Sequence, residues 1–352
     1  MSNSRELSKL AGSYGTGGFT GMKNRIINGA MAIDQRNLGA AVTNINATLY
    51  SCDRWGFLGT LSSKFTAQQS NSAPVGFTNS QLYTSLSAYS VTSADWFVFR
   101  QRIEGFNVND LAWGAASAQT ISVSFWVKSS IAGTFGGSIS NSALNRSYPF
   151  SYVINTINTW EYKTVSIPGD TSGTWLTDNN TGIQLSFSLG AGATFSGAAG
   201  TWAGANYYSS TGATSIVGTS GATLAITGVQ LEKGSTATSF ESRFYGTEFR
   251  LCQRYYQELY ENSVIGNCVS TTGWVSALSF PTFMRTSPTY TRKLSSLTIN
   301  DTAAAYASTA ADTVITSVGG MRIFNSGFTG LTTNRGAYGN GAVLQFQLNA
   351  EP

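Results

Sequence analysis

The stretch Gly228–Tyr256 reads GVQLEKGSTATSFESRFYGTEFRLCQRYY and marks a change in the kind of sequence along the chain. Its first half alternates in the manner of a strand that ends at Gly234. In its second half, apolar side chains recur with the spacing of one face of a short helix. Thr247 suits the N-cap of this helix, and Glu248 falls in its first turn, where the helix dipole favours an anion. The stretch predicts a helical hinge, residues 241–260, between two β-domains.

The residues before this hinge, 22–240, carry strands with a clear alternation of apolar and polar side chains. The segments 121–130 (ISVSFWVKSS) and 182–189 (GIQLSFSL) each place their apolar residues on one face, which is the period of a half-buried strand. The last segment, 222–234, alternates and then changes phase at Gly228, which predicts a bulge. We expect about eight antiparallel strands in two sheets, an all-β jelly-roll sandwich.

The two ends of the chain differ from this sandwich. Residues 261–352 contain five candidate strands separated by Pro, Gly or Asn turns, which predict a smaller C-terminal β-domain. A domain of about 90 residues buries a modest fraction of its surface, so association would stabilise it. Residues 1–21 include the run GSYGTGGFTG and cannot form a core by themselves. They form a separate N-terminal segment.

Three short sequence motifs between Asn24 and Tyr256 resemble those of a known family. They are NRIINGAMAIDQRN at 24–37, CDRW at 52–55, and the strand VQLEKG followed after a spacer by CQRYY. Together they resemble bacteriophage virion proteins, chiefly tail-fibre and head-fibre subunits, whose jelly roll is similar to a sugar-binding module. In the last third only FPTFMRTSPTYT and VLQFQLNAEP match.

This resemblance implies a function that the residues alone do not define. It implies a structural subunit of a phage virion, a fibre or adhesin that binds a host-surface glycan and forms a homotrimer. Residues 1–21 would then be a docking segment for other virion proteins. The alternatives are a capsid decoration or head-fibre protein with an assembly role and no specific ligand, and a polysaccharide depolymerase.

Candidate glycan contacts lie in the long loop 190–221, where aromatic residues stand among small ones. Aromatic rings can stack on sugar faces, and an asparagine side chain can donate to and accept from hydroxyl groups. The candidates are Trp202, Asn206, Tyr207, Tyr208 and, from another loop, Trp113. The competing interpretation is that Trp202 only closes one end of the sandwich. Trp55, by its CDRW context, is expected in the core.

The predicted helix, Thr247 to about Leu259, also provides candidates for a subunit interface. Its apolar residues would line the axis of the trimer on one side and face their own domains on the other. Those placed between chains are Phe249, Tyr256 and Leu259, and those turned inward are Leu251, Cys252 and Tyr255.

Charge and hydropathy exclude several classes of function. The chain has 21 Lys and Arg against 17 Asp and Glu, a net charge of +4, and the basic residues are scattered. No stripe of positive charge is present for nucleic acid. No apolar run has membrane-spanning length, and the first residues lack the apolar core of a signal peptide. We expect a virion protein made in the host cytoplasm, without nucleic-acid binding or membrane insertion.

Catalysis and metal binding have little support in the sequence. The chain contains no histidine, which excludes Ser-His and Cys-His nucleophiles and imidazole metal sites. The 17 acidic residues show no clustered motif, and a depolymerase would need two carboxylates at a cleft. Asp53 and Arg54 suggest a local ion pair. Cys52, Cys252 and Cys268 lack metal-type spacing and are expected as buried thiols. We expect no enzyme activity, no cofactor and no metal.

Overall fold

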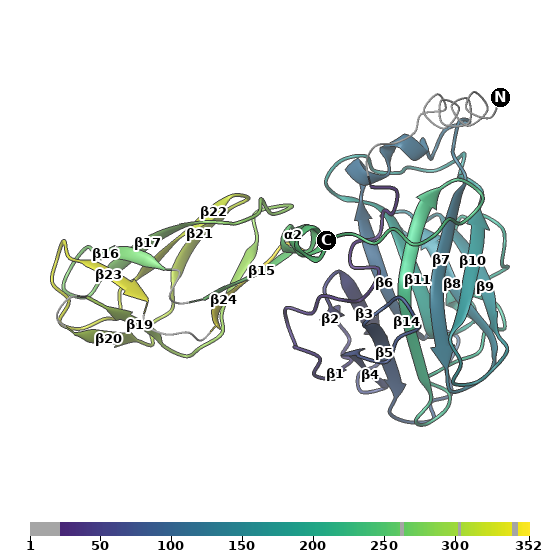
Figure 1. The fold of residues 1–352 in the computed structure, drawn as a ribbon, viewed down its shortest axis with the longest axis horizontal. Coiled ribbons are helices and arrows are strands. Elements are labelled where there is room, and N and C mark those ends of the chain that lie inside the picture. Colours follow the sequence, from purple (N-terminus) through teal and green to yellow (C-terminus); the bar gives the residue numbers. More distant parts are fainter. Residues whose placement is uncertain (1–21, 261–263, 302–303, 340–343) are drawn as a thin grey trace, which may run out of the picture.

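The computed structural model describes residues 22–260, 264–301, 304–339 and 344–352. A broad β-sandwich is followed by one α-helix and then by a narrower β-domain, as Figure 1 shows. The chain therefore has the expected all-β architecture, a jelly-roll sandwich with a smaller C-terminal β-unit.

The sandwich consists of two six-stranded sheets. One contains, in spatial order, β1 (Val42–Thr43), β4 (Phe65–Ser70), β5 (Ser80–Ser85), β14 (Thr223–Lys233), β7 (Ile121–Ser129) and β10 (Glu161–Ile167). The other contains β2 (Leu49–Cys52), β3 (Trp55–Gly59), β6 (Trp96–Glu104), β11 (Thr181–Ala191), β8 (Gly133–Ser140) and β9 (Ser147–Ile154). Shorter elements complete it: η1 (Gly105–Asn107), η2 (Asn109–Leu111), η3 (Ala193–Phe195), β12 (Ser196–Gly197) and β13 (Ser209–Ser210).

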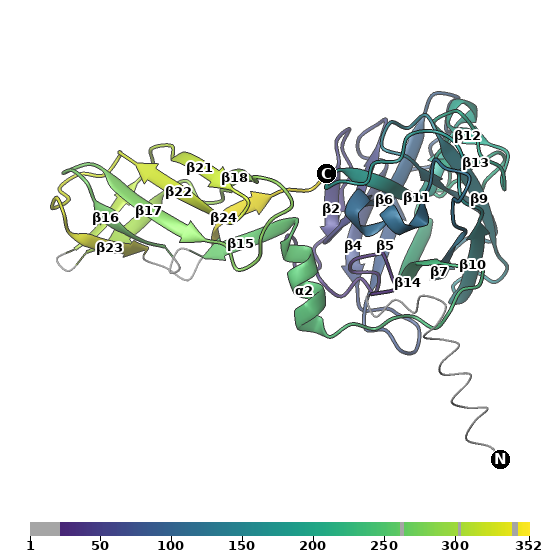
Figure 2. The same cartoon turned by 90° about the horizontal axis from the view of Figure 1, so that it is seen from above.

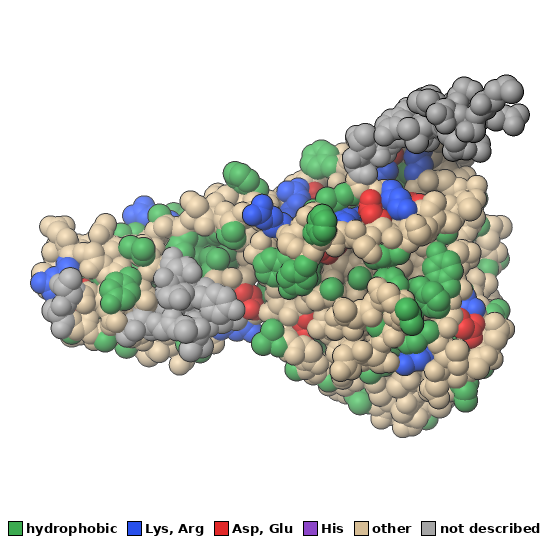
Figure 3. All heavy atoms as spheres, viewed as in Figure 1, with side chains coloured by type: hydrophobic (Ala, Val, Ile, Leu, Met, Phe, Trp, Pro, Cys, Tyr) green, Lys and Arg blue, Asp and Glu red, His purple; other side chains and the backbone are tan. Residues whose placement is uncertain are grey.

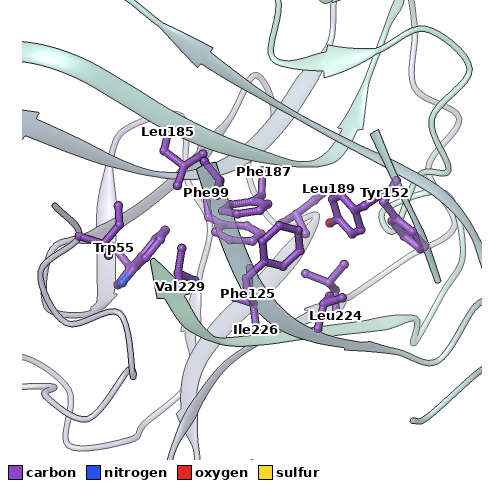
Figure 4. Close-up of a cluster of buried hydrophobic side chains, with 14 of the residues drawn as sticks. Trp55, Phe99, Phe125, Tyr152, Leu185, Phe187, Leu189, Leu224, Ile226 and Val229 are labelled. Atoms are coloured by element: carbon purple, nitrogen blue, oxygen red, sulfur yellow. The ribbon is translucent and has the colours of Figure 1, made fainter. Parts of the chain in front are cut away.

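The predicted placement of the apolar residues of β7 and β11 on the core face is confirmed, but β11 is not half-buried as expected, because its polar residues Gln184, Ser186 and Ser188 are buried as well. The inward residues of β7 and β11 are almost completely buried: Ile121, Val123, Phe125, Val127, Ile183, Leu185, Phe187 and Leu189. Aromatic rings from both sheets meet in the centre of the sandwich (Figure 4). Phe187 stacks on Phe99 with ring centroids 5.1 Å apart and receives the edge of Phe125 at 5.0 Å. Trp55 is fully buried beside them, as expected for a core residue.

Gly228 produces the bulge that the change of phase predicts. Its φ of 61° lies in the left-handed region, and the pairing of β14 with β7 shifts between Thr227 and Gln230. The shift turns the strand by one position, so Ile226 before the bulge and Val229 after it are both fully buried. A strand without this bulge would place one of these two apolar sets in solvent.

The second β-unit contains two sheets. The three-stranded sheet contains β15 (Tyr256–Tyr260), β24 (Leu344–Asn349) and β18 (Thr289–Arg292). The seven-stranded sheet contains β20 (Ala305–Ser308), β19 (Leu297–Asn300), β23 (Gly336–Gly339), β16 (Ile265–Cys268), β17 (Trp274–Ser279), β22 (Gly320–Asn325) and β21 (Thr313–Ser317). Its core is separate from that of the sandwich and includes Trp274, Ile323, Phe346 and Leu348.

The helix is shorter than the sequence predicts. Helix α2 covers Tyr245–Gln253, its N-cap is Phe244 rather than Thr247, and no side chain caps it. The residues after it, expected in the helix, form β15 and pair with β24. The reason is tertiary: as a strand, this segment gains a partner for its backbone, buries Tyr256 and Gln257, and packs Leu259 against the C-terminal core. These gains outweigh local helical spacing.

The two domains are joined by buried ion pairs. Glu351, whose side chain is 4% exposed, accepts hydrogen bonds from Arg54 and, at 3.2 Å, from Arg36. Arg36 also reaches Asp53 at 3.3 Å. The expected local pair of Asp53 with Arg54 is therefore wrong: Arg54 has a left-handed φ of 71°, which turns its side chain away from its neighbour and toward the C-terminal domain.

A second set of contacts lies beside the first. The Glu104 carboxylate accepts two hydrogen bonds of 2.8 Å from the Arg254 guanidinium and one of 2.5 Å from the Tyr255 hydroxyl. Arg54 lies over the Tyr255 ring, 3.3 Å from its centroid. Figure 2 shows helix α2 and the last residues of the chain meeting the sandwich here. We call this region the domain junction.

Removal of the Glu351 charge should destabilise the protein strongly. Glu351→Gln leaves Arg54 buried without its carboxylate partner, a change that costs about 3–5 kcal/mol. Asp110→Asn is the matched control, because Asp110 pairs with Arg25 while 25% exposed, where an ion pair contributes about 0–1 kcal/mol. Thermal unfolding should show a much lower melting temperature for Glu351→Gln only; equal melting temperatures would contradict this role of Glu351.

Candidate functional site

A groove with aromatic walls crosses the outer face of β7, β10 and β14. It has a volume of about 500 Å³, within the usual range for ligand sites. Its lining residues are Phe77, Trp126, Tyr162, Gly228, Ala237, Thr238, Ser239 and Phe240. We call it the aromatic groove.

Strand register brings the main rings of the groove together. Trp126 on β7 and Tyr162 on β10 are directly opposite each other in the sheet, with ring centroids 5.4 Å apart. Both point away from the core, Trp126 half-buried and Tyr162 43% exposed. Phe77 and Phe240 form the opposite wall, edge to face at 5.1 Å. The four rings come from four separate parts of the chain, three in the sandwich and one in the linker that follows it.

Gly228 lies between the two aromatic pairs. A Cβ atom at this position would lie 2.6 Å from a ring carbon of Phe77 and 3.2 Å from one of Trp126. The glycine is therefore needed twice, for the left-handed backbone of the bulge and for the close approach of the rings. The bulge that keeps the core in phase also shapes the floor of the groove.

The polar side chains that line the groove are uncharged, although the Lys23 ammonium lies beside them and donates to the Thr238 hydroxyl and the Ser239 carbonyl. Thr238 and Ser239 are exposed on its rim, and no carboxylate lines it. Within the described residues, the Tyr162 hydroxyl has no hydrogen-bond partner. Lys128, on the same strand as Trp126, places its ammonium 5.1 Å from the Trp160 ring centroid and bonds the Ser72 hydroxyl. The groove thus combines an apolar floor with hydroxyl groups at its edge.

The structure brings two of the predicted glycan contacts together elsewhere. The Trp113 and Trp202 rings are nearly perpendicular, with centroids 5.4 Å apart, and Trp175, which no sequence pattern singled out, completes a cluster of three indoles. Each indole N–H already donates to a backbone carbonyl, those of Gln119, Pro168 and Ser172. The three rings are half-buried against the edge of the core, which is the geometry of a cluster that closes one end of the sandwich.

The other loop candidates lie apart from this cluster. Tyr208 is only 3% exposed and packs against Trp96 at 4.8 Å, so its ring face is not available to a ligand. Asn206 and Tyr207 are half-buried, and the Asn206 amide donates to the Tyr208 hydroxyl at 3.5 Å. The loop therefore does not assemble its four candidates into one surface.

The residues assigned to a subunit interface lie within the chain's own packing. Phe249 on α2 contacts a small cluster that includes Ile27 and the fully buried Cys252. Tyr256 is 3% exposed, with the Arg36 guanidinium 3.7 Å from its ring centroid. Leu259 packs against the C-terminal core. Because Tyr256 and Leu259 lie on a strand, they do not share a helical face with Phe249.

The three cysteines are free thiols and buried, as expected. Among the described residues, no group of three Cys, Asp or Glu side chains is placed to hold a metal ion. No helix in this part of the chain is long and apolar enough to cross a membrane.

None of the known protein families matches this sequence, and no curated protein is significantly similar to it. Solved structures that are similar to part of this chain include the enzymatically active domain of tailspike protein 4 from bacteriophage CBA120, at 14% identity and a TM-score of 0.33. That match covers 60% of this chain but only 22% of the tailspike chain. Another is a family 11 carbohydrate-binding module from Clostridium thermocellum, at 13% identity over 59% of this chain and 100% of the module, with a TM-score of 0.28.

The aromatic groove left a partial signal in the sequence. In ISVSFWVKSS, Trp126 falls on the polar face of an alternating strand, where a large aromatic residue has no core to fill. Tyr162 falls beside it only through the pairing of β7 with β10, and Phe77 and Phe240 only through tertiary folding. An aromatic residue on a solvent-facing strand position was therefore the one detectable sign.

The double role of Gly228 can be tested with a matched pair of glycines. Gly228→Ala and Gly221→Ala both place a side chain at a left-handed φ, 61° and 73°, at a cost of about 1 kcal/mol each. Only Gly228→Ala also meets the Phe77 and Trp126 rings, whereas Gly221 has nothing within 4 Å. This overpacking should add about 1–3 kcal/mol, measured by calorimetry, with a change in tryptophan fluorescence. Equal destabilisation of the two variants would argue against a packed groove.

Proposed function

We propose that this protein is a structural subunit of a phage virion, a fibre or adhesin, and that it binds a host-surface glycan in the aromatic groove. The observation that carries the proposal is the pair Trp126 and Tyr162, two adjacent rings on the outer face of the sheet. Core packing accounts for neither ring, since both point away from the sandwich interior.

The chemistry of the groove suits an uncharged sugar chain. The C–H faces of a sugar ring are apolar and pack on aromatic rings, while its hydroxyl groups seek hydrogen bonds at the edge. Trp126 and Tyr162 offer the first kind of surface, and the hydroxyl groups of Ser239 and Tyr162 offer the second. The Thr238 hydroxyl is already bonded to Glu232 and Lys23. The lining contains no carboxylate, so the groove itself offers no acid for cleavage of a bound glycan.

The proposed role in a virion rests on the resemblance of three sequence motifs to phage fibre and head-fibre subunits. The docking role proposed for residues 1–21 concerns a segment outside the described residues.

A homotrimer is part of the same proposal, and light scattering on the purified chain tests it. We expect a particle with the mass of three copies of the 37.4 kDa chain. A monomer at micromolar concentration would contradict the homotrimer.

Substitutions in the groove test glycan binding directly. Trp126→Ala and Tyr162→Ala should each weaken binding to host cells and to a glycan array by about tenfold, since a lost aromatic contact costs about 1.4 kcal/mol. Both side chains are partly in solvent, so the melting temperature should change little.

Trp202→Ala is the control from the loop cluster. It should lower the melting temperature and leave the affinity of the folded protein unchanged, because its N–H and ring are engaged within the sandwich. Full binding by both groove variants would favour a decoration protein without a specific ligand. If Trp202→Ala were the one variant to lose binding, the glycan site would lie in the loop 190–221 instead.

A further inference from the structure

A second hollow adjoins the aromatic groove where the linker enters helix α2. It has a volume of about 190 Å³, which is room for several water molecules. Its walls come from residues between 24 and 32, from 76–78, and from residues between 240 and 248. Phe77 and Phe240 line both this hollow and the aromatic groove, so the two lie next to each other along one aromatic wall. We call the second hollow the linker pocket.

The shared wall is an apolar surface that the sandwich does not use for its own packing. Phe77 and Phe240 meet edge to face, both rings are half-buried, and neither belongs to the core of the sandwich. A sugar chain that lies on Trp126 and Tyr162 would therefore meet two further aromatic rings on its way to the linker pocket.

A fifth aromatic ring lines the linker pocket itself. Tyr245, the first residue of α2, is 63% exposed, and its ring stacks on that of Phe249 one helical turn later, with centroids 6.0 Å apart. Phe249 in turn packs against the buried cluster around Cys252, so the Tyr245 ring is held in place although it lies largely in solvent. Among the described residues, the hydroxyl groups of Tyr245 and of Ser242, in the same lining, have no hydrogen-bond partner. Tyr245 thus combines a supported ring with a hydroxyl that is available to a ligand.

The charged groups of the linker pocket are bonded to one another. The four terminal N–H groups of Arg243 donate to the carboxylates of Glu241 and Glu248 and to two backbone carbonyls, so none is left for an anionic ligand. Each carboxylate accepts three hydrogen bonds, and a carboxylate has about four acceptor sites. Both are partly exposed, Glu241 by 24% and Glu248 by 15%. The pocket can therefore accept a hydrogen bond from a ligand hydroxyl, whereas it would repel a carboxylate or a phosphate.

Glu241 is an acceptor and not an acid. Burial raises its pKa, but the backbone N–H groups of Asn24 and Lys23 and the Arg243 charge outweigh burial and hold the pKa of Glu241 below its ordinary value. The acid of a glycosidase needs the opposite, a carboxyl group whose pKa is raised. The environment of Glu241 therefore suits binding of a saccharide and not its cleavage.

We propose that the aromatic groove and the linker pocket form one site for a linear, neutral oligosaccharide, whose units lie from Trp126 and Tyr162 across Phe77 and Phe240 to Tyr245. The aromatic rings pack on the apolar faces of successive sugar rings. A neutral ligand also suits the protein surface, on which charged side chains are few, as Figure 3 shows for one face of the molecule. The inference rests on the function proposed for the groove and deepens it: the ligand is a stretch of a polysaccharide chain and not a single terminal sugar.

Affinity as a function of ligand length tests this site on the full chain. The probes are linear cello-, xylo-, manno- and galacto-oligosaccharides of one to six units on a glycan array, and calorimetric titration follows each series that binds. Two units can contact Trp126 and Tyr162, whereas longer members also reach the rings beyond. We expect the affinity to rise about tenfold between two and four units, the effect of one added aromatic contact.

A matched pair of neighbouring aromatic residues locates the gain. Tyr245→Ala should reduce the tenfold gain with length to about twofold or less, and Ser242→Leu, which replaces an exposed hydroxyl of the lining, should also reduce it. Phe244→Ala should keep the gain, because Phe244 is 89% exposed and does not line the pocket. Each variant is judged by the ratio of its own affinities for four and two units, so a change in stability does not mimic lost binding.

The outcomes separate this inference from the function on which it rests. Equal affinity for short and long members, with Trp126→Ala still weakening both, would overturn the extended site and leave glycan binding in the aromatic groove. A gain with length that persists in Tyr245→Ala would also overturn it, because the sugar chain would then continue elsewhere. If the parent protein bound no member of any series, that result would contradict both proposals.

Discussion

The contact of the Glu351 carboxylate with Arg54 and Arg36 determines how the two domains are placed. All three side chains are nearly or completely buried, and a buried charge tolerates little displacement from its partner. Glu104 with Arg254 adds a second pair beside it. Two such pairs at separate points of the junction oppose rotation about either one, so the ion pairs set the relative orientation of the sandwich and the C-terminal domain.

These contacts show where prediction from sequence ends. Arg54 and Glu351 are 297 positions apart, and no local pattern connects them. The alternation in β7 and β11 and the change of phase at Gly228 are local, and all were predictable because strand period alone decides which side chains face the core. The end of α2 was not predictable, since Tyr256 lies on a strand that pairs with β24, at the far end of the chain.

In the candidate site, too, local sequence pattern indicated one residue, and tertiary folding placed the others. Trp126 was visible as an aromatic residue on a polar strand face, while its partner Tyr162 came from sheet register and Phe240 from the linker. The loop residues around Trp202 looked more like a ligand site in sequence, because aromatics among small residues are typical of binding loops. Their rings and N–H groups are instead engaged with one another and with backbone carbonyls. Composition located the aromatic residues but did not tell packing from exposure.

The linker between the domains connects the aromatic groove to the junction physically. Phe240 forms a groove wall, and the next residue, Glu241, accepts hydrogen bonds from the backbone N–H groups of Lys23 and Asn24. Two residues on, Arg243 bonds the Ile26 carbonyl and the Glu248 carboxylate at the start of α2. The linker is therefore held on the sandwich along its length instead of hanging between domains. Because α2 begins directly after these contacts, a force on the C-terminal domain would reach the sandwich through ion pairs and helix, and the groove wall would move only if the linker detached.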